Sequence, residues 1–494
     1  MSEGKYKKLL SNTAIYGLGT FASKILVFLL TRLYTECLSP QEYGTADLIT
    51  NAANLLIPLA AAGVCDGIFR FTLDSSENKK SVFSTGCLMI AFSSLVFLAI
   101  SALLGGFGIF SEYLWLVALY VIMSNFHSAC ALYIRALDKT KLYAAQGILN
   151  TVLTISLNVI FLVVLPQESF LNGVNGYVLS VVLADFLVGI FLVLYAHLYR
   201  DISIKSFERP LAIQMMKYSL PLVPTTIFWW ITNVSDRFMV TYFSGEAANG
   251  LYTAAYKIPT LLILVTGVFS EAWQFSAVKE NEEQGRSEFY STVFGCFKSL
   301  IFVIGAFVIA FSQIIALILY AEEYYIAWEY IPILVVASIF SSFVTFFSSV
   351  YVVKKKSIKS FLTAMVGAIV NVLLNFLLIP NSLSIFGKSV TLAGLGARGA
   401  AIATMISYLA VFVIRAIDSR KILRFKIGAF NIVLNVVVLA AQALVLLFVH
   451  DTLLLVIGQA ACVLAIIAVN LKQLLSAVRS ILVSLKRRKR GKNE

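Results

Sequence analysis

Four basic side chains lie inside segments that are otherwise strongly apolar: Lys24, Arg32, Arg237 and Lys257. From the helical rise of about 1.5 Å per residue, Lys24 is placed near the centre of its segment and the other three about 8–12 Å from one end. A cation that faces hydrocarbon costs about 2.5 kcal/mol or more, so these residues are expected to line a hydrated or protein-lined interior. In such an interior they would bind an anionic group such as a phosphate.

Acidic residues in similar segments offer a second kind of chemistry. Asp185 lies near the middle of an apolar segment, and Asp236 and Glu271 also lie in or near apolar segments. A carboxylate at this depth can relay a proton or bind an ion, and it can also serve only as the acceptor of buried hydrogen bonds. The sequence leaves both roles open for these three residues.

The two arginines have a structural alternative to ligand binding. Glu36 lies four residues after Arg32, and Asp236 directly precedes Arg237. Each arginine could therefore pair with this local acid and extend its side chain toward the membrane interface. In that case neither guanidinium would be available to a ligand.

The segments that carry these residues are long enough to cross a membrane. The chain of 494 residues is 59% hydrophobic and only 13% charged, whereas soluble domains are about 25% charged. Its recurrent apolar runs of about 18 residues or more can each span a hydrocarbon core of ~30 Å as a helix. The sequence predicts an all-α polytopic membrane protein with fourteen transmembrane helices, at residues 12–37, 44–66, 82–106, 113–134, 143–165, 176–197, 214–242, 249–276, 292–318, 328–352, 360–380, 395–416, 427–449 and 452–470.

The basic residues predict the orientation of these helices. Of the 39 lysines and arginines, 33 lie in, or close to, the terminal and connecting segments that fourteen spans place on one side. The positive-inside rule makes that side cytoplasmic, with both termini on it. The opposite loops are short and acidic. The net charge of +13 therefore reflects the orientation of the spans in the membrane. Attraction to anionic lipids is a secondary effect. No nucleic-acid partner is expected.

Two stretches about two hundred residues apart indicate an internal repeat. In "LTRLYTECLSPQEYGTADLI" (30–49) Arg32 precedes Gly44 by twelve residues, and in "SDRFMVTYFSGEAANGLYTAAYKI" (235–258) Arg237 precedes Gly250 by thirteen. Two more pairs of matching positions follow in the same order. Asn158 matches Asn375, and Gly-x-x-Gly at 173–176 matches Gly-x-x-Gly at 396–399. Because an even number of helices separates the equivalents, the repeat is parallel. The predicted organisation is an N-lobe at 1–200 (helices 1–6), a C-lobe at 201–422 (helices 7–12), helices 13 and 14 at 423–470, and a basic amphipathic cytoplasmic tail at 471–494.

Signatures of enzymes, metals and cofactors are not found in the sequence. The six cysteines are scattered without a C-x-x-C pair, and the three histidines are far apart. The sequence "SIFGKS" (384–389) ends like a phosphate-binding loop, but the first glycine of that motif would fall at Ser382. We therefore expect no catalytic residue, no metal and no cofactor, and we do not expect an enzyme.

The two quoted stretches, with "NTAIYGLGTFASKILVFLL" (12–30) before the first, resemble the polysaccharide (Wzx-type) flippases of the MOP superfamily, which is related to lipid II flippases and MATE exporters. The resemblance implies two pseudo-symmetric six-helix lobes in a V around a central cationic cavity, working by alternating access. It implies transport of polyprenyl-pyrophosphate-linked oligosaccharide repeat units from the inner to the outer leaflet of a bacterial cytoplasmic membrane, for surface polysaccharide biosynthesis. The partners it implies are this substrate, membrane lipids, H+ or Na+, and polysaccharide-assembly proteins.

The resemblance also assigns residues to roles. By position, Lys24, Arg32, Arg237 and Lys257 match the cavity charges of the family. Helices 2 and 8 would add Asn51, Asn54 and Tyr256 as polar groups facing sugar or phosphate, or as packing residues, and the candidates for ion coupling are Asp185, Asp236 and Glu271. Three alternatives stay open: an ion-coupled MATE-like exporter of drugs or other small molecules, a lipid II flippase, and a non-transporting membrane scaffold. The predominance of lysine and arginine argues against the exporter.

Overall fold

The computed structural model describes residues 28, 30–74, 77–106, 112–279, 286–353, 357–385 and 388–490. These residues are almost entirely helical, apart from one two-stranded hairpin. They form two compact units, one of residues 1–241 with Gly245–Gly250 and one of Tyr242–Ser244 with residues 251–494. The first unit therefore includes the seventh predicted span, which the sequence repeat assigns to the second lobe. The lobe boundaries drawn from the repeat stay a prediction.

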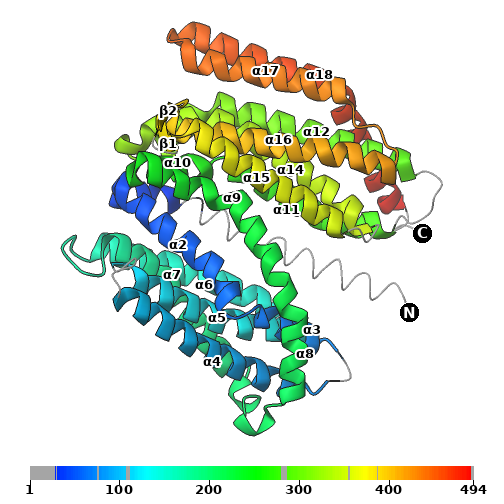
Figure 1. The fold of residues 1–494 in the computed structure, drawn as a ribbon. Helices are drawn as coiled ribbons and strands as arrows, with labels where there is room; N and C mark the ends of the chain where they lie inside the picture. Colours follow the sequence, from blue (N-terminus) through cyan, green and yellow to red (C-terminus); the bar gives the residue numbers. More distant parts are fainter. Residues whose placement is uncertain are drawn as a thin grey trace. The chain divides into compact units, whose positions relative to one another are not determined.

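The first unit begins with a helical segment at 30–37. The elements that follow are α2 (Pro40–Ala60), α3 (Val64–Thr72), α4 (Lys79–Gly106), α5 (Leu114–Ala136), α6 (Thr140–Val159) with the π-helical turn η1 (Ile160–Val164), α7 (Gly173–Tyr195), the 3-10 turns η2 (Leu198–Arg200) and η3 (Ile204–Ser206), α8 (Arg209–Ser219), the 3-10 turn η4 (Leu220–Leu222) and α9 (Val223–Ser244). Helices α2, α3, α4 and α6 contact α5, α7 or both, and α8 contacts α3 and α4 (Figure 1).

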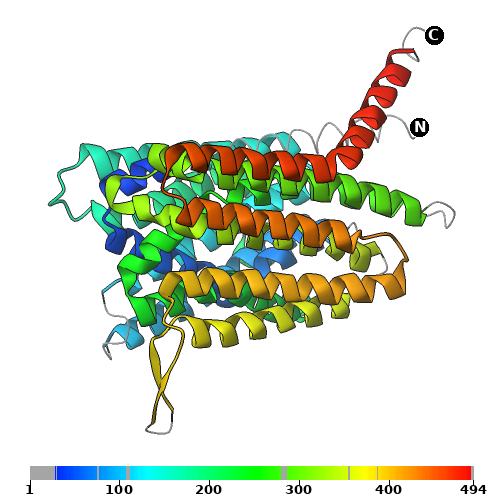
Figure 2. The same cartoon turned by 90° about the horizontal axis from the view of Figure 1, so that it is seen from above.

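The second unit is organised around α14, which contacts α11, α12 and α16. Two further helices, α17 and α18, pack against each other and against α12 (Figure 2). Helix α10 (Glu246–Lys257) leads into this unit, whose elements are α11 (Thr260–Lys279), α12 (Arg286–Ala310), α13 (Ser312–Leu319), the 3-10 segment η5 (Glu322–Tyr330), α14 (Ile331–Val353), α15 (Ser357–Leu378), α16 (Gly396–Ile422), α17 (Ala429–Phe448) and α18 (Thr452–Arg490).

The structure supports the predicted class of polytopic helical membrane protein. Among the described residues, ten helices are long and apolar enough to span a membrane, and the bent pair α2–α3 makes an eleventh. The predicted first span lies largely outside the described residues. The seventh and eighth predicted spans are not among these helices, and each is divided into two helices, α8–α9 and α10–α11. The described helices are consistent with the predicted fourteen spans, but they do not show all fourteen.

Prolines mark the breaks in the divided spans. Proline lacks the N–H that a helix interior needs, so a helix tends to stop or bend near it. Pro221 lies in the turn η4 and Pro224 opens α9. Pro259 lies between α10 and α11, and Pro58 precedes the 56° bend between α2 and α3. Each of these breaks therefore lies at or near a proline.

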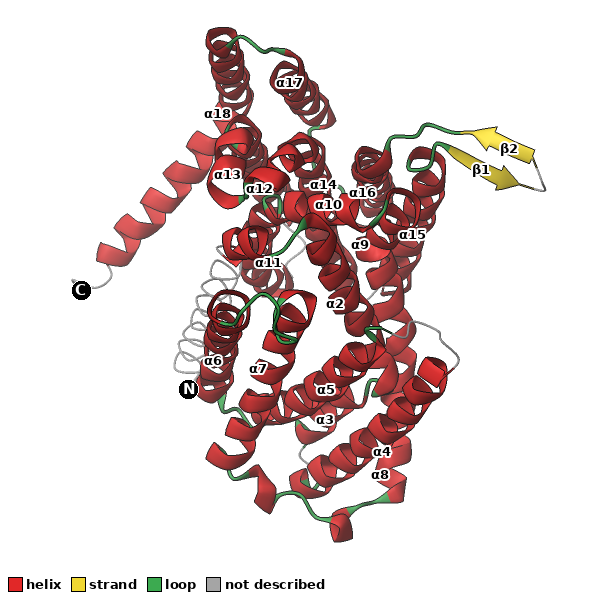
Figure 3. Cartoon of the chain, turned by 90° about the vertical axis from the view of Figure 1, so that its left-hand side faces the viewer, coloured by secondary structure: helices red, strands yellow, loops and turns green. Residues whose placement is uncertain are grey.

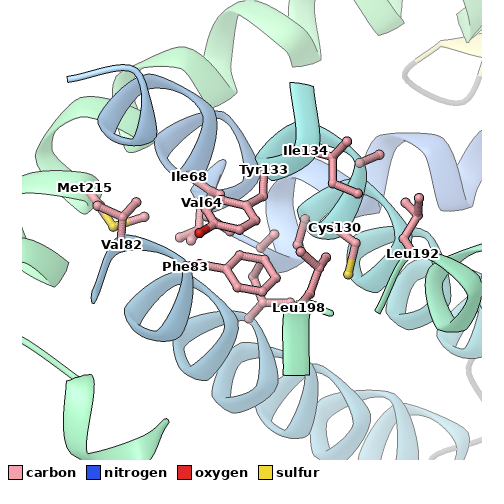
Figure 4. Close-up of a cluster of buried hydrophobic side chains, with 14 of the residues drawn as sticks. Val64, Ile68, Val82, Phe83, Cys130, Tyr133, Ile134, Leu192, Leu198 and Met215 are labelled. Atoms are coloured by element: carbon pink, nitrogen blue, oxygen red, sulfur yellow. The ribbon is translucent and has the colours of Figure 1, made fainter. Parts of the chain in front are cut away.

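The core of the first unit contains an aromatic stack among aliphatic side chains. Phe83 of α4 stacks on Tyr133 of α5 with ring centroids 4.1 Å apart. Ile68, Leu192 and Met215 are fully buried around this pair (Figure 4). These residues come from α3, α7 and α8, so the cluster fixes five helices of the unit against one another.

The core of the second unit is richer in phenylalanine. Phe294 of α12 lies 4.9 Å from Phe346 and 5.3 Å from Phe347 of α14, between ring centroids. Phe412 of α16 contacts Phe347 at 5.7 Å, and Phe425 lies 5.6 Å from the same ring. Large rings that interlock across helices provide the close packing that association inside a membrane requires.

A β-hairpin connects α15 to α16. Its strands β1 (Ser382–Ile385) and β2 (Lys388–Thr391) are antiparallel and extend away from the helices (Figure 3). The sequence that ends like a phosphate-binding loop falls in this hairpin. A phosphate-binding loop would lead from a strand into a helix, so the structure agrees with the exclusion made from the sequence.

Candidate functional site

An ion pair between α2 and α9 is the best-formed charged site among the described residues of the first unit. Arg237 Nη1 binds Asp47 Oδ1, and the two side chains are 14% and 10% exposed. The second carboxylate oxygen, Asp47 Oδ2, is buried and has no hydrogen-bond partner among the described residues. Because a buried guanidinium needs an opposite charge, Asp47 compensates Arg237 when no ligand is present.

Hydrogen bonds from neighbouring residues hold α9 against α2. Asn51 donates through Nδ2 to the carbonyl of Asp47 at 2.8 Å. Trp230 of α9 donates through Nε1 to the carbonyl of Asn51, also at 2.8 Å. Asn51 therefore supports the ion pair through backbone contacts, and Asn54, one turn later, is exposed.

Two further candidates of the first unit, Asp236 and Arg32, differ from each other in burial. Asp236 is 2% exposed, and its Oδ1 accepts the backbone N–H of Arg237 at 2.9 Å. Arg32 forms an ion pair with Glu36 at 2.6 Å, with side-chain exposures of 43% and 49%. The local pairing considered for Arg32 from the sequence is thus present, whereas Arg237 is paired with an acid 190 residues away in the sequence.

The repeated stretches meet through their glycines. Gly44 and Gly250 are each the fifth residue of their helix, α2 and α10. A Cβ on Gly44 would overlap the carbonyl of Glu246, and a Cβ on Gly250 would overlap the carbonyl of Pro40. Asn249 Nδ2 also donates to the Gly44 carbonyl at 3.1 Å. Only glycine permits this backbone-to-backbone approach, which we call the glycine crossing.

A second buried site in the first unit surrounds Asp185 of α7. Its Oδ1 lies 2.9 Å from His127 Nδ1 and accepts from Asn150 Nδ2 at 2.8 Å, while Oδ2 accepts from Ser124 Oγ. The other ring nitrogen of His127 lies 2.7 Å from Gln146 Oε1. Helices α5, α6 and α7 thus contribute to one network, which we call the Asp185 network.

The imidazole of His127 on α5 connects α6 and α7 in the Asp185 network. One ring nitrogen faces Asp185 and the other faces the side-chain amide of Gln146. The orientation of that amide decides which ring nitrogen carries the proton.

The remaining candidates lie in the second unit or outside the description. Lys257 ends α10, and the Tyr256 ring centroid lies 6.0 Å from that of Tyr252. Glu271 belongs to α11, but its side chain is outside the described part, and Lys24 is outside the described residues altogether. The structure brings together Arg237, Asp47 and Asn51, and it places Arg32 in a separate pair. Convergence of the four basic residues on one chamber stays a prediction.

Two buried cations were missed in the sequence because they were counted among cytoplasmic segments. Lys298 of α12 is 3% exposed and donates to the Ile427 carbonyl at 3.3 Å. Arg415 of α16 is fully buried. The guanidinium of Arg415 donates to neutral oxygens on α14 and α15: the Val344 carbonyl at 2.9 Å, Thr363 Oγ1 at 2.9 Å, the Ser360 carbonyl at 3.2 Å, and Ser348 Oγ. Both residues lie inside predicted spans, and their burial was not foreseen from the sequence.

His127 was also missed as a functional residue, since the sequence presents it as isolated. Its partners Gln146 and Asp185 lie 19 and 58 residues away. Among the described residues, no group of three or more histidine, cysteine, aspartate or glutamate side chains could hold a metal ion.

The sequence of this chain matches a known protein family. Residues 9–274, more than half of the chain, match the family described as "Polysaccharide biosynthesis protein". No curated protein matches the sequence.

Solved structures show the same fold at low sequence identity. The lipid II flippase MurJ in an inward closed conformation matches with a TM-score of 0.67 at 15% identity, covering 95% of this chain and 100% of that one. An inward-facing multidrug resistance MATE family transporter of the MOP superfamily matches with a TM-score of 0.62 at 15% identity, covering 81% and 95%. A MOP superfamily transporter from Pyrococcus furiosus, for which reverse polarity of the binding pocket suggests a different function, matches with a TM-score of 0.55 at 15% identity, covering 83% and 96%.

Proposed function

The chain belongs to the polysaccharide biosynthesis protein family and has the fold of MOP superfamily transporters, and from this premise we propose that it is a flippase for lipid-linked oligosaccharides. The substrate is an oligosaccharide repeat unit joined by pyrophosphate to a polyprenyl lipid. The protein moves it from the inner to the outer leaflet of a bacterial cytoplasmic membrane by alternating access, and the product enters surface polysaccharide biosynthesis. Both termini are cytoplasmic in this proposal.

The observation that carries the proposal is the buried pair of Arg237 and Asp47. A guanidinium binds phosphate oxygens through two parallel N–H donors, which makes arginine well suited to a pyrophosphate. In the absence of substrate, Asp47 keeps the charge of Arg237 compensated and its side chain in place. Binding of the pyrophosphate would replace Asp47 as the partner of Arg237. The released carboxylate then disfavours a second anion at the same place.

The Asp185 network supports coupling of this cycle to H+. A carboxylate and an imidazole that share protons inside the membrane can change charge without any large movement. Asp236, buried next to Arg237, is a second acid through which an ion could influence the substrate site. Glu271 and the alternative ion Na+ stay part of the proposal.

The lipid tail of the substrate can remain in the bilayer, and polysaccharide-assembly proteins would receive the product.

The first test removes the proposed phosphate ligand. In a host without its own repeat-unit flippase, Arg237→Ala should abolish surface polysaccharide and cause lipid-linked repeat units to accumulate, because the headgroup loses its buried cation. Lys24→Ala and Lys257→Ala should act in the same direction. The readouts are surface glycan staining and mass spectrometry of extracted lipid-linked sugars, with membrane protein level checked by immunoblotting.

A matched control is Arg398→Ala, since Arg398 also pairs with a glutamate, Glu329, but is 57% exposed. This variant should export polysaccharide normally. Normal export by Arg237→Ala at wild-type protein level would contradict the role of Arg237 in substrate binding.

Two other transport functions have observations in their favour. The buried acids Asp47, Asp185 and Asp236 suit an ion-coupled exporter of cationic drugs, and the MATE fold matches this chain. The MurJ fold covers 95% of the chain, which favours lipid II as a substrate. Drug resistance conferred on an exporter-deficient host, without any glycan phenotype, would support the first. Rescue of cells depleted of their lipid II flippase would support the second.

A further inference from the structure

A polar cavity of about 400 Å³ opens at one end of the first unit. It lies where α2, α5 and α7 begin, and it is lined by Glu42, Tyr113, Gln167, Asn172 and Asn175 among others. The acidic short loops place this end of the helices on the outer side of the membrane in the predicted topology. None of the residues that line the cavity is a lysine or an arginine. The lining therefore suits an uncharged polar ligand better than a phosphate.

Part of the lining is fixed by internal hydrogen bonds. Asn172 donates to the carbonyls of Leu165 and Pro166 at 3.2 and 3.3 Å, and its Oδ1 accepts the backbone N–H of Gly173 at 2.5 Å. Because both polar atoms of its side chain already form hydrogen bonds within the protein, Asn172 shapes the wall of the cavity. Contacts with a ligand are left to other groups.

Other polar atoms of the lining remain available. Glu42 Oε2 accepts from the backbone N–H and the hydroxyl of Ser39, at 2.9 and 2.8 Å, which leaves Oε1 free to accept from a ligand. Asn175 Nδ2 donates to the Phe170 carbonyl at 3.0 Å, which leaves its Oδ1. The Tyr113 hydroxyl donates to the neighbouring Glu112 carboxylate, which leaves the phenol oxygen to accept from a ligand. The cavity thus offers three acceptors for hydroxyl groups.

An exposed aromatic pair lies close in the sequence to residues that line the cavity. Trp115 and Phe170 are stacked with ring centroids 5.7 Å apart, although they are 41% and 66% exposed. Trp115 follows the lining residue Tyr113 by two positions, and the carbonyl of Phe170 is the acceptor for Asn175. Exposed stacked rings beside polar planar groups match the chemistry of a sugar, which presents hydroxyls at its rim and apolar C–H groups on its face.

We propose that this cavity is a carbohydrate-binding site that holds an uncharged sugar residue of the glycan on the outer side of the membrane. Glu42, Asn175 and Tyr113 bind its hydroxyls, and Trp115 with Phe170 packs against its apolar face. The inference rests on the proposed function for the identity of the glycan. In the transport cycle the site would hold the sugar part after the pyrophosphate has left Arg237, and so oppose its return.

The test uses the full-length protein in lipid nanodiscs and a printed array of bacterial surface glycans that carry neither lipid nor phosphate. The wild-type protein should retain at least one glycan of the array. Trp115→Ala and Asn175→Ala should each lower the retained signal at least tenfold, while Trp115→Phe should keep most of it because an aromatic face remains. The control is Tyr325→Ala, which removes an exposed aromatic ring (37% exposed) from the second unit and should bind like the wild type.

The outcomes separate this inference from the proposed function. Absence of any glycan binding by the wild type, or equal binding by the wild type and both alanine variants, would overturn the carbohydrate site while leaving transport by Arg237 untouched. Glycan binding that depends on Trp115 and Asn175, in a protein that exports no repeat units in cells, would uphold the site and reject the flippase assignment.

Discussion

Apart from Arg237, which is 14% exposed, the most deeply buried charged residues of the two units differ in sign. In the described part of the first unit, the buried charged residues are Asp47, Asp185 and Asp236. In the described part of the second unit they are Lys298 and Arg415. Asp47 is paired with a cation from another helix, whereas the guanidinium of Arg415 donates its hydrogen bonds to neutral oxygens.

The difference separates groups that can change charge from a group that cannot. Carboxylates and imidazoles lose or gain protons within the range of biological pH, while arginine stays charged. The Asp185 network therefore has the chemistry for coupling to an ion. Arg415 instead joins α14, α15 and α16 permanently. We infer that Arg415 acts as a fixed support within the second unit, whereas the groups proposed to exchange protons belong to the Asp185 network.

The largest effect is expected at Arg415. Arg415→Ala would leave several buried oxygens without donors and should lower the free energy of unfolding by about 3 kcal/mol or more. Thermal melting of the detergent-purified protein, followed by size-exclusion chromatography, measures the loss. Arg398→Ala, which removes an exposed arginine, should change stability by less than about 1 kcal/mol. Equal melting of the two variants would contradict the supporting role of Arg415.

Removing one member of the Arg237–Asp47 pair is expected to lower the free energy of unfolding by a similar but smaller amount. Asp47→Ala removes the opposite charge that Asp47 provides to Arg237 and should cost about 3 kcal/mol. The double variant Asp47→Leu/Arg237→Met should recover part of that stability, because both charges of the pair are removed together. The same melting assay compares the single and double variants. A double variant less stable than Asp47→Ala would show that the pair does not act as a charge-compensated unit.

The Asp185 network is expected to affect transport more than stability. Asp185→Asn keeps the size of the side chain and one acceptor oxygen, but it cannot exchange a proton. Uptake driven by an imposed pH gradient in proteoliposomes should fall at least tenfold, equivalent to about 1.4 kcal/mol, and His127→Gln should act in the same direction. An unchanged response to the pH gradient in both variants would remove H+ coupling from this site.

Arg32 should show the smallest effect on stability. Its pair with Glu36 is half-exposed and lies within one helix, so Arg32→Gln should cost at most about 0.5 kcal/mol. Polysaccharide export by the same variant separates its two possible roles. Reduced export at unchanged stability would make Arg32 a substrate ligand, whereas normal export would leave it as a local ion pair.

Features that depend on neighbouring residues in the sequence could be predicted. The membrane class follows from apolar runs, and the breaks in α8–α9 and α10–α11 follow from prolines 221, 224 and 259. The pair of Arg32 with Glu36 follows from their spacing of four residues. In each case the physical cause acts within one helix.

Features that depend on folding could not be predicted in the same way. Nothing in the sequence connects Asp47 to Arg237, 190 residues later, or His127 to Asp185, 58 residues later. Arg415 lies near the end of a span, where a cation normally extends to the interface. Its ligands are hydroxyls and carbonyls, which carry no charge that would reveal them.

The glycine crossing has a consequence for motion. Gly44 and Gly250 approach through backbone atoms, and Asn249 contributes a single side-chain hydrogen bond to the Gly44 carbonyl. Glycine has no rotamers to lose, so re-forming this contact after each separation carries almost no side-chain entropy cost. Helices that meet in this way can part and rejoin many times without having to search for the correct fit.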